Sequence, residues 1–385
     1  MNLLSKTDLR EIIENSRQPC ISIYMPAERT GVETRANPTR LKNLIRNVEE
    51  QLDALGYESR QTGDILAPAV DLVDDAGFWR QQDDGLAILA SPGIFRYWQL
   101  PLRFDEVSVA ASHFYLKPVM PLLSSDGRFF VLALSQNNVR LLESTRYDSR
   151  EVGLEDTPKS LKEALKYDDS ERQVQFHTPE PGGKDKAGQA AIFHAHGVGE
   201  EDEKKDIIRF VQQVDNGVVS KLASGGEPLI LAGAEPTIGL YRKVNSYGNL
   251  IEEIISGNPD DMSNDYLREQ AWTIIEPYFA ETRARIAEKF QDLRASDLAS
   301  SKLREVLPAA WQGRVDTIFA ATDARQWGTF DGAANRLRFH QEREPGDEDL
   351  INLAILYTFV NSGTVYVVEQ SEVPGASGVA AIYRY

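Results

Sequence analysis

Three of the five histidines of this chain lie in one stretch between residues 176 and 203. His194 and His196 alternate, so on a β-strand they would share a face, and His177 precedes them. Three imidazoles with a nearby carboxylate are ligands that suit zinc. The spacing matches no rigid ligand motif such as HExxH, however, so the sequence predicts no metal site and no cofactor. A metal-dependent hydrolase that uses these histidines stays open as an alternative.

The same stretch is rich in glycine, which permits positive φ angles and close approach of the backbone to a partner. A long glycine-rich segment between structured elements is typical of an exposed functional excursion. We call residues 177–199 the arm and expect it to reach toward a large partner. The glycines of the arm are Gly182, Gly183, Gly188, Gly197 and Gly199.

Basic residues gather at the entrance of the first long helical pattern. The formal net charge of −17 argues against general binding to DNA or RNA, because such affinity depends on cations that replace counterions at phosphates. Any RNA contact must therefore be local, and this cluster is its best candidate. The alternative is a solvated helix face. The cluster consists of Arg29, Arg35, Arg40, Lys42 and Arg46.

Composition bounds the class of protein. The apolar fraction of 42% is enough to form hydrophobic cores, and no run approaches the 18 apolar residues of a membrane span. The charged N-terminus lacks the apolar region of a signal peptide, which predicts a cytoplasmic protein with no membrane partner. Cys20, the single cysteine, lies in an apolar run and is expected to be a buried small side chain.

Alternating helix and strand patterns predict an α/β fold. Three segments each read as a strand, a polar turn and a second strand, which predicts three β-hairpins and three α/β domains. These segments are Gly85–Leu100, Arg128–Glu143 and Val315–Phe330. We expect domains over residues 1–125, 126–262 and 263–385. In the third, Pro277 should kink or restart a helix.

Several of these segments together resemble the bacterial branch of the archaeo-eukaryotic release factor superfamily, which is related to eukaryotic class I release factors and Pelota. The matching pieces include RFFVLALSQNNVRLLE, FHAHGVG, VDNGV, EPLILAGAEPTIGLYRKVNSYGNL and GRVDTIFAATDARQWGTFD. The resemblance covers nearly the whole chain. It implies three domains that mimic a tRNA in the ribosomal A site. It also implies a ribonuclease H-like middle domain and a last domain similar to a ribosomal-protein-type RNA-binding fold.

In catalytic members of this superfamily, a Gly-Gly-Gln loop of the middle domain positions the water that attacks peptidyl-tRNA. This chain has Ala187, Gly188 and Gln189 in the corresponding arm, so the first glycine of that motif is missing. Gln189 is the one candidate catalytic residue. The resemblance therefore implies a ribosome-binding factor in rescue or hibernation, without hydrolysis of its own. A translational GTPase as delivery partner, a peptide-releasing factor and a protein-binding scaffold stay open.

Overall fold

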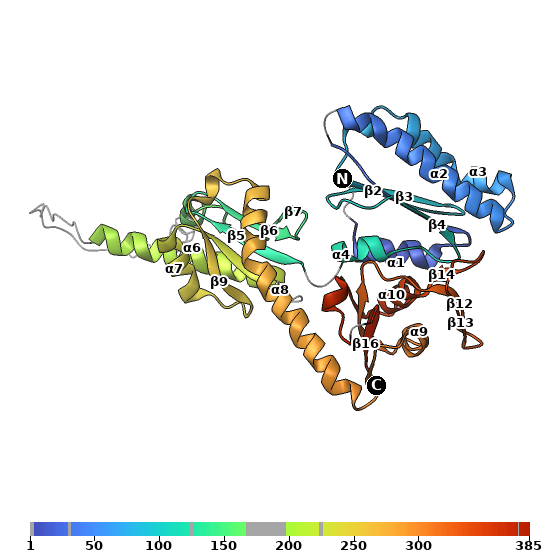
Figure 1. The fold of residues 1–385 in the computed structure, drawn as a ribbon. Helices are drawn as coiled ribbons and strands as arrows, with labels where there is room; N and C mark the ends of the chain where they lie inside the picture. Colours follow the sequence, from blue (N-terminus) through green and yellow to red (C-terminus); the bar gives the residue numbers. More distant parts are fainter. Residues whose placement is uncertain (1–3, 30–31, 124–126, 167–197, 223–225, 376) are drawn as a thin grey trace, which may run out of the picture. The chain divides into compact units, whose positions relative to one another are not determined.

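The computed structural model describes residues 4–29, 32–123, 127–166, 198–222, 226–375 and 377–385. The chain forms two compact units (Figure 1). The first unit combines Met1–Asp126 with Ala280–Tyr385, and the second is Gly127–Phe279. The expected α/β class is confirmed, because helices pack on mixed and antiparallel sheets in both units. The division into three domains stays a prediction.

The N-terminal part of the first unit is built on an antiparallel sheet of order β3-β2-β1-β4. Its strands are β1 (Cys20–Pro26), β2 (Gly85–Ser91), β3 (Ile94–Leu100) and β4 (Val107–Ala111). Its helical elements are α1 (Lys6–Asn15), η1 (Val32–Arg35), α2 (Ala36–Ala54), α3 (Ser59–Asp74), η2 (Phe78–Arg80), η3 (Lys117–Val119) and α4 (Met120–Leu123). Helices α2 and α3 lie side by side over one face of the sheet (Figure 1).

Strand β1 is buried on both faces, as its unbroken apolar run predicts. Ile21 and Ile23 pack in the cluster that includes α2 and α3, whereas Cys20 and Tyr24 pack in the cluster that includes α1. Burial raises the pKa of the Cys20 thiol to about 11, so this cysteine is an unreactive core residue, as expected.

The C-terminal part of the first unit contains two sheets. The larger has the order β10-β16-β11-β15, and the smaller has the order β13-β12-β14. The strands are β10 (Ala299–Ser300), β11 (Val315–Ala321), β12 (Trp327–Asp331), β13 (Arg336–His340), β14 (Glu348–Asp349), β15 (Thr364–Val368) and β16 (Val379–Tyr383). The helical elements are α9 (Leu303–Trp311), α10 (Leu350–Val360) and η5 (Gln370–Glu372). Helix α10 is apolar on nearly every side and lies in a core shared with the N-terminal part.

The second unit has one five-stranded sheet of order β7-β6-β5-β8-β9. Its first three strands pair antiparallel, and β8 and β9 then add in parallel. This is the strand order of a ribonuclease H-like sheet, as expected for the middle of the chain. Its strands are β5 (Phe129–Leu134), β6 (Val139–Ser144), β7 (Ser149–Val152), β8 (Leu229–Gly233) and β9 (Leu250–Ser256).

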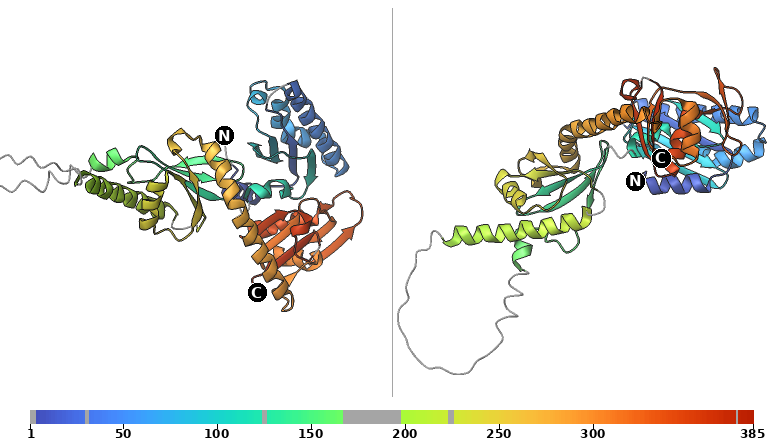
Figure 2. Two further views of the ribbon diagram at one scale, coloured as in Figure 1. Left: turned by 60° about the vertical axis from the view of Figure 1, so that its left-hand side comes forward. Right: turned by 90° about the horizontal axis from the view of Figure 1, so that it is seen from below.

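Helices cover both faces of this sheet (Figure 2). Helices α6 (Val198–Leu222) and α7 (Glu235–Val244) pack on one face, and the first half of α8 (Asn264–Arg294) packs on the other. A short η4 (Pro259–Asp261) precedes α8. Helix α8 runs through Pro277 without restarting, and its second half packs Phe290 against the larger sheet of the first unit.

Two of the three expected hairpins are confirmed, since β2 pairs with β3 and β5 pairs with β6. The third prediction is wrong: β11 and β12 lie in different sheets. Strand β11 is buried along almost its whole length and pairs with β15 and β16, which come much later in the chain. A local strand–turn–strand pattern cannot reveal such a distant partner. Among the helices in the described ranges, none combines the length and apolar content that a membrane span requires.

Two glycines of the N-terminal part should respond in opposite ways to alanine. A Cβ at Gly85 would lie 2.1 Å from the carbonyl oxygen of Leu102, whereas a Cβ at Gly63, inside α3, would meet no atom within 4 Å. We expect Gly85→Ala to lower the free energy of unfolding by about 1–3 kcal/mol through overpacking. Gly63→Ala should raise it by about 0.5–1 kcal/mol. Thermal unfolding of both variants tests this, and a shift in the same direction would contradict it.

Candidate functional site

The arm falls mostly outside the described residues, so its predicted roles stay predictions. This applies to His177, Gly182, Gly183, Gly188, Gln189, His194, His196 and Gly197. Gly199 lies in the first turn of α6. Nothing in the described structure tests Gln189 as a catalytic residue.

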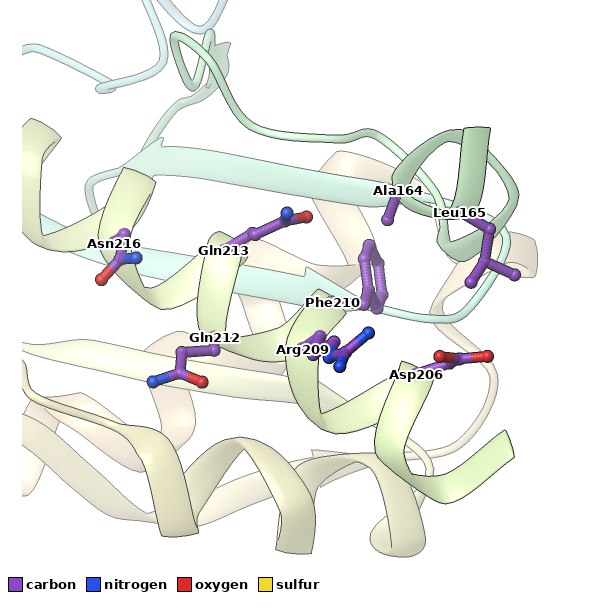
Figure 3. Close-up of a pocket in the computed structure, with 8 residues that line it drawn as sticks. All are labelled: Ala164, Leu165, Asp206, Arg209, Phe210, Gln212, Gln213 and Asn216. Atoms are coloured by element: carbon purple, nitrogen blue, oxygen red, sulfur yellow. The ribbon is translucent and has the colours of Figure 1, made fainter. Parts of the chain in front are cut away.

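Residues from before the arm and from the helix that follows it line one pocket of the second unit (Figure 3). A helical segment, residues 161–166, precedes the arm in the chain, and α6 begins at the end of the arm. Ala164 and Leu165 of the leading segment line the pocket together with Asp206, Arg209 and Phe210 of α6. Phe210 is fully buried and forms the apolar base, while polar side chains of α6 surround it. This packing joins the segment that precedes the arm to the helix that follows it.

A buried carboxylate joins α6 to α7 in the same unit. Asp215 is 2% exposed and accepts hydrogen bonds from the Tyr241 hydroxyl at 3.1 Å and from the backbone N–H and hydroxyl of Ser246 at 3.0 and 2.6 Å. Burial and the neighbouring carboxylate raise the pKa of Tyr241, so the phenol stays protonated and donates. Buried charge is tolerated when its lone pairs are satisfied in this way. Asp215 therefore has a structural explanation.

Gly217 of the same VDNGV segment also has a packing role. A Cβ at this position would lie 1.9 Å from the side-chain oxygen of Thr157, so only glycine lets α6 approach this loop without a shift of the threonine. The segment that carried part of the family resemblance thus fixes α6, which follows the arm, against the rest of the second unit.

The basic cluster at the entrance of α2 is divided by its ion pairs. Arg29 contacts Asp83 and lies 2.8 Å from Asp84, and Arg40 lies 3.0 Å from Glu106. Arg46 contacts Glu50 one helical turn away at 3.2 Å. Arg35 and Lys42 are exposed and form no ion pair with the described part of the chain. These two cations are therefore the members of the cluster most available to an external anion.

Arginines of the C-terminal part lie over aromatic rings, a feature that sequence reasoning missed. Arg343 lies 5.2 Å from the ring centroid of Trp327, and Arg304 lies 5.9 Å from that of Phe339. Strand β13 also presents Arg338, which is exposed and has no hydrogen-bond or ion-pair partner among the described residues. The alternating basic residues of RLRFH were the available signal. Guanidinium groups and aromatic faces are groups that nucleic acids contact.

Two histidines are held by carboxylates, as expected for structural histidines. His113 Nδ1 lies 3.1 Å from both oxygens of Glu348, and His340 Nδ1 lies 2.8 Å from an oxygen of Asp347. Within the described ranges, no group of three or more His, Cys, Asp or Glu residues is arranged to hold a metal ion. The histidines of the arm lie outside those ranges.

Comparison with known proteins identifies a family for the middle of the chain. Residues 129–277 match the family model described as bacterial archaeo-eukaryotic release factor family 7. This range holds the five-stranded sheet, the arm, α6, α7 and the first part of α8. No curated protein sequence matches the chain.

Similar solved structures include three translation-related proteins. An archaeal translation termination factor, aRF1, is 14% identical over 99% of both chains, with a TM-score of 0.23. Archaeal Pelota, in a ribosome-bound arrangement with ABCE1, is 12% identical over 76% of this chain and 72% of that chain, with a TM-score of 0.38. Dom34 of S. cerevisiae, a termination-like factor that interacts with Hbs1, is 13% identical over 78% of this chain and 80% of that chain, with a TM-score of 0.37. At such TM-scores these likenesses carry no argument about function.

Proposed function

We propose, from the match of residues 129–277 to bacterial archaeo-eukaryotic release factor family 7, that the chain is a ribosome-associated translation factor. The family match carries the proposal, because it spans the unit that holds the arm. The factor would occupy the A site by tRNA mimicry, in ribosome rescue or hibernation, and would act in the cytoplasm. Its partners would be ribosomal RNA and, at delivery, a translational GTPase.

The base of the arm supports this arrangement. Ala164 and Leu165, which precede the arm, line one pocket together with residues of α6, which follows the arm. A segment whose flanking elements are packed on a folded unit can be directed into a narrow site, and the entropy cost of ordering then falls on the segment itself. The proposed path of the arm is the one that the acceptor end of a tRNA takes.

The departure from Gly-Gly-Gln favours a factor that does not hydrolyse peptidyl-tRNA. Ala187 stands where the motif has its first glycine, and alanine cannot adopt the positive-φ conformations that glycine adopts without strain. Gln189 would then lack the backbone geometry that positions the water. We therefore assign binding, and not peptide release, as the primary activity.

Arg35 and Lys42 are the proposed phosphate contacts, since the other three members of the cluster are paired with carboxylates. We expect the wild-type protein to pellet with ribosomes through a sucrose cushion. The double variant Arg35→Glu/Lys42→Glu should bind at least tenfold more weakly and lose about two units of the slope of log affinity against log salt, as expected for two phosphate contacts. Binding curves at several salt concentrations measure both.

A matched control makes the same charge change elsewhere. Arg60→Glu/Lys289→Glu alters two exposed cations on α3 and α8 that form no ion pair with the described part of the chain, and it should bind like the wild type. Equal losses in both double variants would mean that net charge alone governs binding, which argues against a specific contact. A wild-type protein that stays in the supernatant with empty, translating and stalled ribosomes would refute ribosome binding.

A further inference from the structure

A cavity of about 610 Å³ lies in the N-terminal part of the first unit, and no residue of the basic cluster lines it. Helix α3 forms one wall, and the turn between β2 and β3 forms the other. Ligand pockets in proteins commonly have volumes of roughly 300–1,000 Å³. Its walls are mainly apolar and include Tyr57, Ile65, Ile94 and Phe95. The cavity is thus of a size and composition that suit a small organic molecule.

One polar atom in the cavity wall lacks a partner. Ser91, at the end of β2, is 1% exposed and lines the cavity, and its hydroxyl has no hydrogen-bond partner among the described residues. Buried hydroxyls are normally paired, and an unpaired one costs about 1–3 kcal/mol. The Ser91 hydroxyl is closed to solvent, so a ligand in the cavity does not contact it in this conformation.

A second polar feature comes from a proline inside α3. Pro68 has no N–H, so it cannot donate to the carbonyl oxygen of Asp64, which is its acceptor position in an α-helix. Both residues line the cavity. Asp64 therefore offers a carboxylate and a backbone carbonyl without its usual helical donor. Both are acceptors, so they favour a ligand rich in donors.

Charge distinguishes between classes of ligand. Of the described residues that line the cavity, only Asp64 is charged, and neither lysine nor arginine is among them. A phosphate or carboxylate would find no cation here and would meet the Asp64 charge. An amine or amidinium would pair with that carboxylate, while its apolar body would pack against Tyr57 and Phe95.

We propose that the cavity between α3 and the β2–β3 turn binds a small organic cation with a flat apolar body. In this arrangement Asp64 pairs with the cationic head, and the aromatic and aliphatic wall holds the body. The site is independent of ribosome binding.

Three probes of nearly equal shape test the proposal on the full-length protein. Benzamidine is a cation, benzamide is neutral and benzoate is an anion, so ligand-observed NMR titrations compare charge at constant size. We expect benzamidine to bind at least fivefold more tightly than benzamide, and benzoate to show no saturable binding. Asp64→Asn should weaken benzamidine about threefold to tenfold and leave benzamide unchanged, as expected for one exposed ion pair. Asp71→Asn, which removes an exposed carboxylate from α3 outside the cavity lining, should change neither affinity.

Ser91→Ala provides a second control and should leave the affinities for benzamidine and benzamide unchanged, because the Ser91 hydroxyl is closed to solvent. Because Asp64 is exposed, Asp64→Asn is expected to fold even if Ser91→Ala does not, and thermal unfolding checks both variants. Equal affinities for the three probes, or an effect of Asp71→Asn equal to that of Asp64→Asn, would overturn the proposal. The absence of saturable benzamidine binding to the wild type would overturn it as well.

Discussion

Replacing Asn352 by leucine is expected to destabilise the first unit by at least about 3 kcal/mol. Asn352 of α10 is 6% exposed, and its Oδ1 accepts from the backbone N–H groups of Leu116 and Lys117 at 2.7 and 3.1 Å. Its Nδ2 donates to the carbonyl of Phe114 at 2.9 Å. Leucine has nearly the same size but would leave these three buried backbone groups unpaired, at about 1–3 kcal/mol for each uncompensated group.

The measurement is the hydrogen-exchange protection of α10 and of residues 114–117, together with thermal unfolding. Thr358→Val is the matched control on the same helix. The hydroxyl of buried Thr358 donates to the carbonyl of Ala354 at 2.8 Å, an oxygen at the ordinary α-helical acceptor position. We therefore expect a loss of less than about 1 kcal/mol. Equal losses in the two variants would show that Asn352 acts through packing alone.

Lys117→Met should cost about 3–5 kcal/mol near neutral pH, because it leaves a buried carboxylate without its cation. Lys117 Nζ lies 3.8 Å from Asp349 Oδ2, both side chains are almost fully buried, and Lys117 also donates to the carbonyl of Ala324. Burial lowers the pKa of Lys117, an effect that the Asp349 charge partly opposes. Burial raises the pKa of Asp349, and Lys117 partly opposes that rise.

The sign of the pH dependence follows from the raised pKa of Asp349. A group with a raised folded-state pKa contributes stability that is fully present below its ordinary pKa of 3.8 and is lost as the pH rises through the folded-state pKa. In Lys117→Met the folded-state pKa of Asp349 rises further. The destabilisation should therefore be greatest at pH values above that pKa. It should shrink as the pH falls toward 3.8. Unfolding measured at several pH values between 4 and 8 tests this.

The double variant Lys117→Met/Asp349→Asn separates charge from packing. Asparagine keeps an oxygen that can accept from the backbone N–H groups of Ile351 and Gln326, as Asp349 does now at 3.1 and 3.2 Å. With neither charge present, most of the lost stability should return and the added pH dependence should vanish. If Lys117→Met loses the same free energy at every pH, or if the second substitution brings no recovery, buried charge is not the cause.

The sequence determined the elements whose signals are local. The periodic apolar residues of α2, the apolar run of β1 and the hairpins β2–β3 and β5–β6 all follow from side-chain period and turn chemistry. The segments around β5 and α6 also indicated the release factor resemblance, and residues 129–277 match a model of that family. It named the basic cluster at α2 as well, though not its ion pairs.

Only the tertiary structure decided which distant residues meet. The partners of β11, the continuation of α8 through Pro277, and the bonds from Asn352 to residues 114–117 join groups whose separation along the chain hides the contact. The same reason applies to the ion pairs of Arg29 and Arg40, because their carboxylate partners lie elsewhere in the N-terminal part. It applies also to the cavity between α3 and the β2–β3 turn. Sequence patterns report the period and burial of each element, whereas pairing, charge compensation and cavities depend on how elements pack.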